Sequence, residues 1–193
     1  MSFSRIYNQA AARKGGEVAL RAMLPRVAEP GELEAMGDDR YLSEVTRCVF
    51  KAGFVWRVIE NKWPGFEDAF KGFVPLYWQQ VPPEVLEELA QDERIVRNMQ
   101  KIRTVPDNAR MIVDGAREHG GFGAFLSQWP SHDQVGLLMW FKRHGARLGG
   151  NTAQNFLRRV GWDGFVLSSD VAAGLHREER LDASPGSKKA LVQ

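Results

Sequence analysis

Apolar residues recur at steps of three and four along much of the chain, and this spacing is typical of helices with one buried face. The first such run contains Leu42, Val45, Val49, Ala52, Trp56 and Ile59, with Gly53 as a candidate break. A second run, from Val135 to Phe141, is expected to end near Gly145, and a third, from Ala153 to Val160, to end at Gly161. No alternation typical of a strand is found, so the pattern predicts an all-α fold.

The segments around these runs predict where helices begin and end. Residues 5 to 25 are expected to form an irregular helical arm, because Lys14, Gly15 and Gly16 divide them, and residues 27 to 39 a connector. Pro82 and Pro83 suit the start of a helix, whereas Pro106 marks a break before Asn108. Ser131 and Gln134 have the spacing of a capping box.

Composition narrows the class of protein. A chain of 193 residues, 44% of them hydrophobic, can bury a core as one domain or two tightly packed lobes. Its 26 basic and 24 acidic residues nearly cancel, so any affinity for nucleic acid must come from a local basic face. The single cysteine, Cys48, excludes an intramolecular disulfide and a cysteine-rich metal site. With no apolar stretch near the roughly 20 residues that span a bilayer, we expect a cytoplasmic protein with no membrane partner.

Three stretches carry candidate chemistry. The stretch from Gly145 to Asp170 has the order hairpin, helix, loop and isolated carboxylate. Residues 91–112 contain Arg97, Lys101, Ile102, Asn108 and Ala109 in a distinctive order, and residues 51–59 contain Ala52, Gly53 and Trp56. The alternatives are structural. The hairpin could be an ordinary joint between helices, and Ser168, Ser169 or Asp170 could each cap a short helix.

In this order, the three stretches resemble the DNA 3-methyladenine glycosylase I family of the helix-hairpin-helix DNA glycosylase superfamily, over about residues 40 to 175. The resemblance implies a two-lobed helical fold with a cleft between the lobes. It makes residues 41–178 the glycosylase-like domain, residues 1–40 an arm and connector, and residues 179–193 a flexible tail. It also implies a monomer that acts on double-stranded DNA containing a damaged base and needs no cofactor.

The resemblance assigns DNA binding to the hairpin and to the start of the following helix. The residues concerned are Arg147, Leu148, Gly149, Gly150, Asn151 and Thr152. Arg147 stands where the family has the first glycine of a pair. Asp170 is the implied catalytic carboxylate, which would stabilise positive charge on the sugar. Asn151 stands where bifunctional relatives have a lysine nucleophile, which implies a monofunctional enzyme that uses water.

The resemblance also implies a pocket for the extruded base. Its candidate residues are Trp56, Phe54, Cys48, Tyr77, Lys101 and Asn108. Core packing is the alternative for Trp56 and the preferred interpretation for Phe50 and Trp78, while Phe54 is also a candidate wedge into the duplex. For Lys101 we favour a solvated or phosphate-pairing position.

The sequence departs from the family in two ways. The cysteines and histidines of the family's zinc site are missing, so no metal is expected. Cys48 stands where the family has the acid that recognises the methylated base, so either the lesion differs or Glu44 or Glu60 takes that role; a small buried apolar residue is the alternative for Cys48 itself. Two rival functions follow: a non-catalytic DNA-binding protein on the same scaffold, and a helical protein-interaction domain.

Overall fold

The computed structural model describes residues 3–177, and this part of the chain is all helical. Its helices, in order, are α1 (Phe3–Arg13), α2 (Glu17–Ala22), α3 (Pro30–Ala35), α4 (Asp38–Lys51), α5 (Trp56–Ala69), the 3-10 turn η1 (Lys71–Phe73), α6 (Pro75–Trp78), α7 (Pro83–Leu89), α8 (Met99–Ile102), α9 (Thr104–Ala116), α10 (Phe122–Gln128), α11 (Gln134–His144), α12 (Asn151–Val160) and α13 (Ser169–Arg177). No strand occurs among these residues, so the all-α prediction is confirmed. The tail expected at residues 179–193 lies outside the described part.

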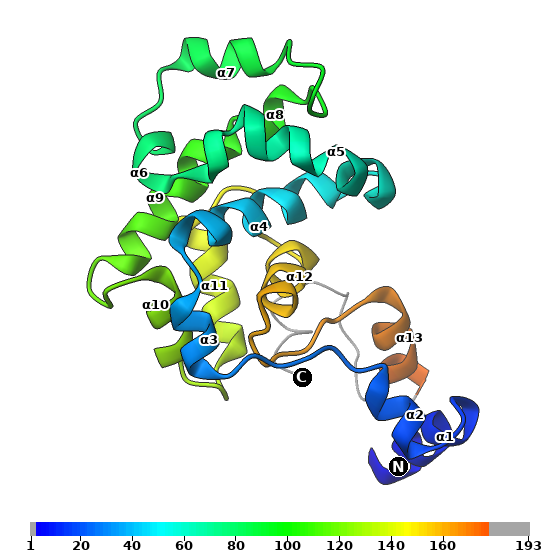
Figure 1. Ribbon diagram of the computed structural model, residues 1–193. Helices are drawn as coiled ribbons and strands as arrows, with labels where there is room; N and C mark the ends of the chain where they lie inside the picture. The colour runs from blue at the N-terminus through cyan, green and yellow to red at the C-terminus, as the bar shows by residue number, and fades with distance from the viewer. Residues whose placement is uncertain (1–2, 178–193) are drawn as a thin grey trace.

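The helices form two lobes, which are joined by α4 and α9 (Figure 1). The upper lobe contains α5 to α8, and the lower lobe contains α3 and α10 to α13. Helix α4 packs against α5, α9 and α12, while α9 packs against α6 and α10. The two joining helices therefore contact both lobes and set their spacing.

Helix α4 is buried on most of its surface. Five of its side chains have an exposed fraction of 1% or less: Tyr41, Leu42, Val45, Val49 and Phe50. The helix ends at Lys51, and Gly53 follows with φ +67°, a left-handed conformation that favours glycine. Helix α5 then begins in a new direction at Trp56, as the glycine break predicted.

Several predicted boundaries are corrected by the structure. The connector contains a short helix, α3, which Pro30 begins and which the Glu29–Glu32 capping box stabilises. Pro106 does not break the chain, because it lies in the first turn of α9, where a missing backbone N–H costs no helical hydrogen bond. Pro83 begins α7 as predicted.

The predicted capping box at the start of α11 is also wrong. Asp133 caps this helix instead, because its carboxylate accepts a hydrogen bond from the backbone N–H of Gly136 at 2.9 Å. Gln134 is buried, and its side chain reaches the loop after α12. Its amide nitrogen donates to the carbonyl of Phe165, and its amide oxygen accepts from the backbone N–H of the same residue. The end of α11 at His144, just before Gly145, is as predicted.

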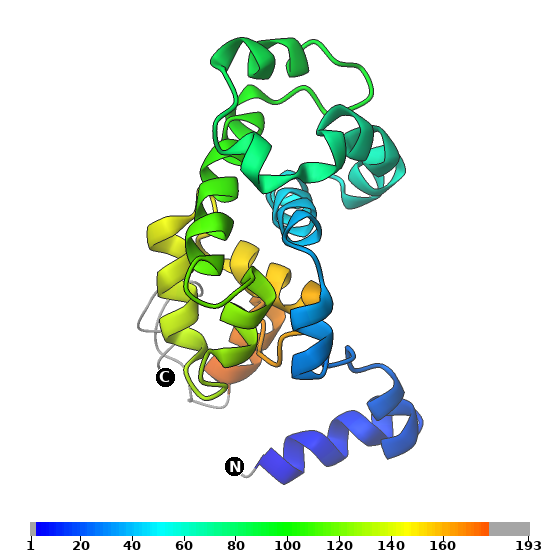
Figure 2. The same ribbon diagram turned by 60° about the vertical axis from the view of Figure 1, so that its left-hand side comes forward.

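The N-terminal arm stands apart from both lobes. Helices α1 and α2 pack on one another, and neither contains a buried residue. Figure 2 shows this pair extending from the lower lobe on an extended connector. The break between α1 and α2 lies at residues 14–16, where Lys14, Gly15 and Gly16 were expected to divide the arm.

Candidate active-site cleft

A cleft of about 680 Å³ opens between the lobes, where the joint between α4 and α5 faces α12. The residues that line it are Pro25, Cys48, Lys51, Ala52, Gly53, Trp56, Asn151, Thr152, Asn155, Arg158 and Arg159. This volume is in the range that small-molecule sites occupy, and it exceeds that of a single nucleobase. The cleft thus combines an aromatic ring, a thiol, neutral polar groups and cations.

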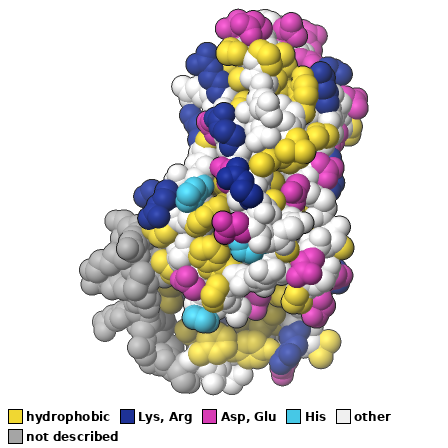
Figure 3. Space-filling model, turned by 90° about the vertical axis from the view of Figure 1, so that its left-hand side faces the viewer, with side chains coloured by type: hydrophobic (Ala, Val, Ile, Leu, Met, Phe, Trp, Pro, Cys, Tyr) yellow, Lys and Arg dark blue, Asp and Glu magenta, His cyan; other side chains and the backbone are white. Residues whose placement is uncertain are grey.

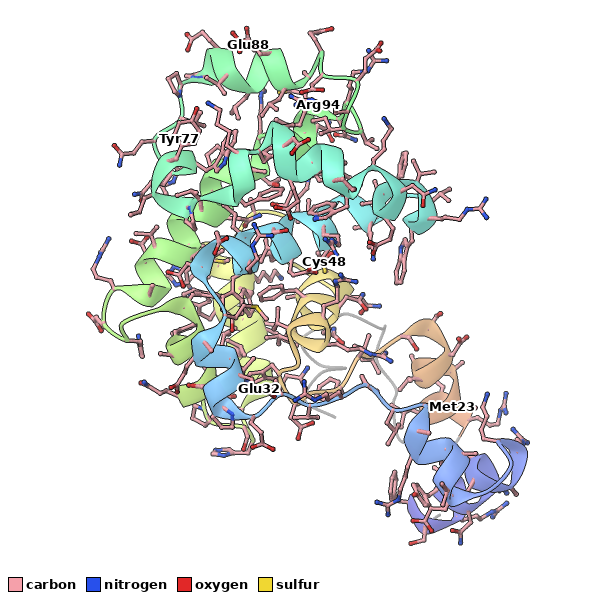
Figure 4. The ribbon with its side chains drawn as sticks, in the orientation of Figure 1. Met23, Glu32, Cys48, Tyr77, Glu88 and Arg94 are labelled. Atoms are coloured by element: carbon pink, nitrogen blue, oxygen red, sulfur yellow. The ribbon has the colours of Figure 1, made fainter. Side chains whose placement is uncertain are left out.

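The first wall of the cleft comes from α4 and the start of α5. Cys48 is buried on the inner side of α4, and Figure 4 shows it near the centre of the molecule, at the level where the lobes meet. Trp56 is 57% exposed, and the Lys51 ammonium lies 5.2 Å from the centre of its ring. A large exposed aromatic at a cleft offers a face on which a base can stack.

A network of ion pairs supports this wall. Arg159 of α12 pairs with Glu44 at 2.5 Å and with Glu60 at 3.6 Å, so it joins α12 to both α4 and α5. Lys51 and Arg47 also pair with Glu60. Both acids are thus engaged by cations, and of the described residues that line the cleft, none is acidic.

Cys48 is held as a thiol. Burial raises its pKa to about 12, although the nearby Arg159 guanidinium opposes this shift. A thiolate is the reactive form of cysteine, so Cys48 has no nucleophilic role at neutral pH. It contributes a small, weakly polar surface to the cleft.

The second wall comes from the hairpin and α12. Arg147 has φ +59° in a region that favours glycine, which fits its place at the glycine position of the hairpin motif. Gly150 has φ +56° and leads into α12, and Gly149 and Asn151 are exposed. Leu148, in contrast, is 1% exposed and packs into the core, so its side chain is not available to DNA.

Lys101 supports the first wall from behind. It is 7% exposed, and its ammonium donates to the backbone carbonyls of Phe50 and Ala52 at 2.9 and 2.7 Å. These carbonyls lie at the C-terminal end of α4, where a cation is favourable. Burial and then the Arg147 guanidinium lower the pKa of Lys101. The expected solvated or phosphate-pairing position is therefore wrong, because the side chain is buried as a helix cap.

Asn108 supports the second wall. It is fully buried, and its amide accepts from the backbone N–H of Ala146 at 2.8 Å and donates to its carbonyl at 3.2 Å. The hairpin is thereby fixed to α9. Neither Asn108 nor Lys101 lines the cleft, and together they hold the backbone on each side of it.

Asp170 is an exposed carboxylate in the first turn of α13. Ser168 caps this helix, because its hydroxyl accepts from the backbone N–H of Val171 at 3.2 Å. Asp170 does not line the cleft. The buried Gln154 connects α12 to the loop before α13, because its amide nitrogen donates to the Gly150 carbonyl and its amide oxygen accepts from the Leu167 N–H.

The remaining candidates divide between the cleft and other places. Phe54 is 43% exposed in the joint beside the cleft, with its ring 5.8 Å from the Lys101 ammonium. Tyr77 lies on α6, where Lys71 donates to its hydroxyl, and Figure 4 shows it well apart from Cys48. Phe50 and Trp78 are fully buried, which agrees with the interpretation of both as core residues. Thr152 lines the cleft, as do Cys48, Trp56 and Asn151.

Sequence reasoning missed the residues that organise the cleft from a distance. Gln134 and Gln154 hold the loop before α13, and Arg159 joins the two walls. Glutamine carries little signal in a sequence, but a glutamine on the apolar face of a helix, as at Gln154, requires a buried partner. Among the described residues, no group of three or more histidines, cysteines and acids could hold a metal ion. None of the helices within residues 3–177 has the length and apolar character that crossing a membrane requires.

Solved structures similar to this chain are 3-methyladenine DNA glycosylases I. One of them is 19% identical, with 75% of this chain and 87% of that chain covered and a TM-score of 0.57. A variant of such an enzyme in complex with 3-methyladenine is 18% identical, with 84% and 95% covered and a TM-score of 0.60. The enzyme from Staphylococcus aureus, solved to explain its 3-methyladenine recognition, is 19% identical with a TM-score of 0.59 and the same coverage. The chain thus has an all-helical DNA glycosylase fold.

The methyladenine glycosylase family model matches residues 33–143, which is more than half of the chain. The protein belongs to this family, and the resemblance inferred from its sequence is confirmed. The matched region contains Cys48, Trp56, Lys101 and Asn108, and it ends before the hairpin and Asp170.

Proposed function

We propose that this protein is a monofunctional DNA glycosylase of base excision repair. It hydrolyses the N-glycosidic bond of an alkylated purine, 3-methyladenine or a similar base, after the nucleotide is extruded from duplex DNA. The observation that carries the proposal is the cleft of about 680 Å³, lined by Trp56 and the start of α12, in a chain of the methyladenine glycosylase family. No cofactor is needed for this hydrolysis.

Extrusion is required because the bond is not accessible while the base is stacked in the duplex. In the cleft, the exposed ring of Trp56 provides a stacking surface, and Asn151, Thr152 and Asn155 offer neutral hydrogen-bonding groups. The N-terminal end of α12, at the edge of the cleft, and the exposed backbone of the hairpin before it favour a phosphate. The base then occupies the cleft while the sugar and phosphates stay at its mouth.

Bond cleavage leaves positive charge on the sugar. The bonding electron pair departs with the base, and an alkylated purine is a good leaving group because its ring is electron-poor before the bond breaks. Asp170, in the first turn of α13, is the carboxylate proposed to stabilise the sugar cation. Water adds to the sugar and loses a proton, which leaves an abasic site.

The chemistry is proposed to stop at the abasic site. Cleavage of the strand by bifunctional glycosylases depends on an amine that forms a Schiff base with the sugar. Asn151 occupies the first position of α12. Lys51, which lines the cleft, pairs with Glu60, and Lys101 donates to backbone carbonyls. Water is therefore the nucleophile.

A second candidate is a DNA-binding protein that has lost catalysis. The observation in its favour is the cleft lining, in which no described residue is acidic and Cys48 remains a thiol. A cationic methylated nucleoside would gain no carboxylate partner there. Such a protein would bind DNA with the salt dependence of phosphate contacts and release no base.

The test is release of free base from methylated duplex DNA, separated by chromatography under single-turnover conditions. Wild type is expected to release base, and Asp170→Asn to slow release by about 100-fold, as for removal of one group that stabilises transition-state charge. Asp163→Asn, an exposed aspartate in the preceding loop, is the matched control and should release base at the wild-type rate. No release by wild type, with DNA binding intact, would favour the non-catalytic protein.

A further inference from the structure

We propose that the N-terminal arm, formed by α1 and α2, binds the phosphate backbone of duplex DNA beside the cleft. The inference rests on the proposed function, because it takes the DNA as already bound at the cleft. It assigns a partner to the helical pair that extends from the lower lobe on the connector (Figures 1 and 2).

The basic surplus of the protein is concentrated in this arm. Residues 1–28 contain five basic residues, Arg5, Arg13, Lys14, Arg21 and Arg26, and one acid, Glu17. Residues 1–28, the arm and the chain that links it to α3, thus have a net charge of +4, whereas the whole chain has +2, so the rest of the sequence is net acidic. A polyanion near the protein is therefore attracted mainly to the arm.

The charges on α1 are available to a partner. Arg5, Arg13 and Lys14 are exposed, and none of them forms an ion pair within residues 3–177. Arg5 and Arg13 are eight residues apart, which puts them about 12 Å apart along the helix and about 80° apart around it. They can thus contact one DNA strand together, because successive phosphates recur at a few ångströms along the duplex axis.

The connector fixes the arm close to the cleft. Pro25, three residues after the end of α2, lines the cleft itself. Three residues later, the backbone N–H of Ala28 donates to the carbonyl of Gly161 at 2.8 Å, which ties the connector to the end of α12. Gly161 is needed at this crossing, because a Cβ there would lie 2.7 Å from the Ala28 Cβ. The arm therefore begins at the mouth of the site where DNA is proposed to enter.

The face of the protein in Figure 3 does not share this charge bias. The face in Figure 3 mixes basic and acidic side chains, with acids gathered at its top over α7. An anionic membrane is the other polyanion to consider, because the arm also exposes Phe3, Val18 and Met23. The middle of α1, however, presents Ala10, Ala11 and Ala12, which give little apolar area for insertion. Duplex DNA is the partner that both the charge and the location favour.

The experiment compares DNA affinity as a function of salt. Binding of an undamaged, fluorescently labelled duplex is measured by anisotropy at 50 to 200 mM salt for wild type and for the double variant Arg5→Glu, Arg13→Glu. The matched control, Arg110→Glu, Arg117→Glu, makes the same charge change on two exposed arginines, one in α9 and one at its C-cap. Circular dichroism melting should be unchanged for the arm variant, because α1 has no buried residue.

The expected result is a salt slope smaller by about 2 for the arm variant, since each phosphate contact contributes about 0.9 to it. Over the fourfold salt range, wild type then loses about tenfold more affinity than the arm variant. The control should keep a slope close to wild type.

Equal slopes for the wild type and the arm variant would overturn the proposal. It would also be overturned if the arm variant bound DNA normally but lost binding to vesicles rich in phosphatidylserine. Failure of wild type to bind duplex DNA even at 50 mM salt would contradict the proposed function as well, so the two failures are distinguishable.

Discussion

The two walls of the cleft are held in different ways. The first wall, from α4 to α5, is fixed by charge: Lys101 caps the end of α4, and Lys51 pairs with Glu60 on α5. The second wall, the hairpin before α12, is fixed by neutral hydrogen bonds from Asn108 to Ala146. The first wall is thus a closed network with a buried thiol, whereas the second presents exposed backbone. The difference suggests that the first wall shapes the base site and the second contacts the DNA.

Loss of the Lys101 cap should give the largest effect. Lys101→Met leaves two carbonyls at the end of α4 without their buried donor, so the free energy of unfolding should fall by about 3 kcal/mol. Urea denaturation measures this change. Lys62→Met is the matched control: this lysine also donates to a carbonyl, that of Glu93, but at the surface, and about 0.5 kcal/mol or less is expected. Equal losses in both variants would contradict the assigned role of Lys101.

Loss of the Asn108 amide should have the next largest effect. Asn108→Leu removes both bonds to Ala146, and the free energy of unfolding should fall by about 2 kcal/mol. DNA affinity should fall as well, because the hairpin is no longer fixed to α9. Asn61→Leu, at an exposed position of α5, should leave both quantities unchanged. If the Asn108 variant bound DNA normally at a temperature where it is folded, Asn108 would not be needed to hold the wall that contacts DNA.

The strain at Arg147 should give a smaller difference. Arg147→Gly relieves the left-handed backbone, whereas Arg147→Ala keeps it, and both lose the 2.7 Å hydrogen bond to Gln100. The glycine variant should therefore be the more stable of the two by about 1 kcal/mol in thermal melts. Both should bind DNA more weakly than wild type. Equal stability of the alanine and glycine variants would contradict this expectation, because it would mean that the backbone at residue 147 leaves the left-handed conformation at no cost.

Ionisation of the Cys48 thiol should have the smallest effect on the stability of the protein near neutral pH. Because its pKa is raised by burial from 9.0 to about 12, the stability from the buried thiol is fully present below pH 9 and is lost as the pH rises toward 12. Native protein at pH 8 should not react with iodoacetamide, whereas urea-unfolded protein should. Rapid labelling of the native protein would contradict the closed first wall.

The sequence predicted the helices and the family better than it predicted the role of each residue. The three-and-four spacing and Gly53 located α4 and α5, because these signals are local. Lys101 and Asn108 were expected in the base pocket, but their partners, at Phe50, Ala52 and Ala146, are brought to them only by the packing of α8 and α9 in the fold. A motif therefore showed which residues matter, and only the fold showed what they bind.

Tyr77 and Cys48 also show that the sequence alone does not place a residue in the fold. Both were candidates for the pocket, yet only Cys48 lines the cleft, because α6 takes Tyr77 into the upper lobe. The link between α12 and the loop before α13 likewise depends on Gln154, which bonds two segments at once. No local pattern encodes such a contact.

The central claim is that the cleft between the lobes receives the extruded base. The most direct test is single-turnover base release from methylated duplex DNA by Asn155→Trp, which fills the cleft from the half-buried face of α12. Lys142→Trp, on the exposed face of α11, serves as the control. If the base enters the cleft, the Asn155 variant binds DNA and melts like wild type but releases no base, while the control releases it normally. Base release by the Asn155 variant at the wild-type rate would show that the base does not enter the cleft.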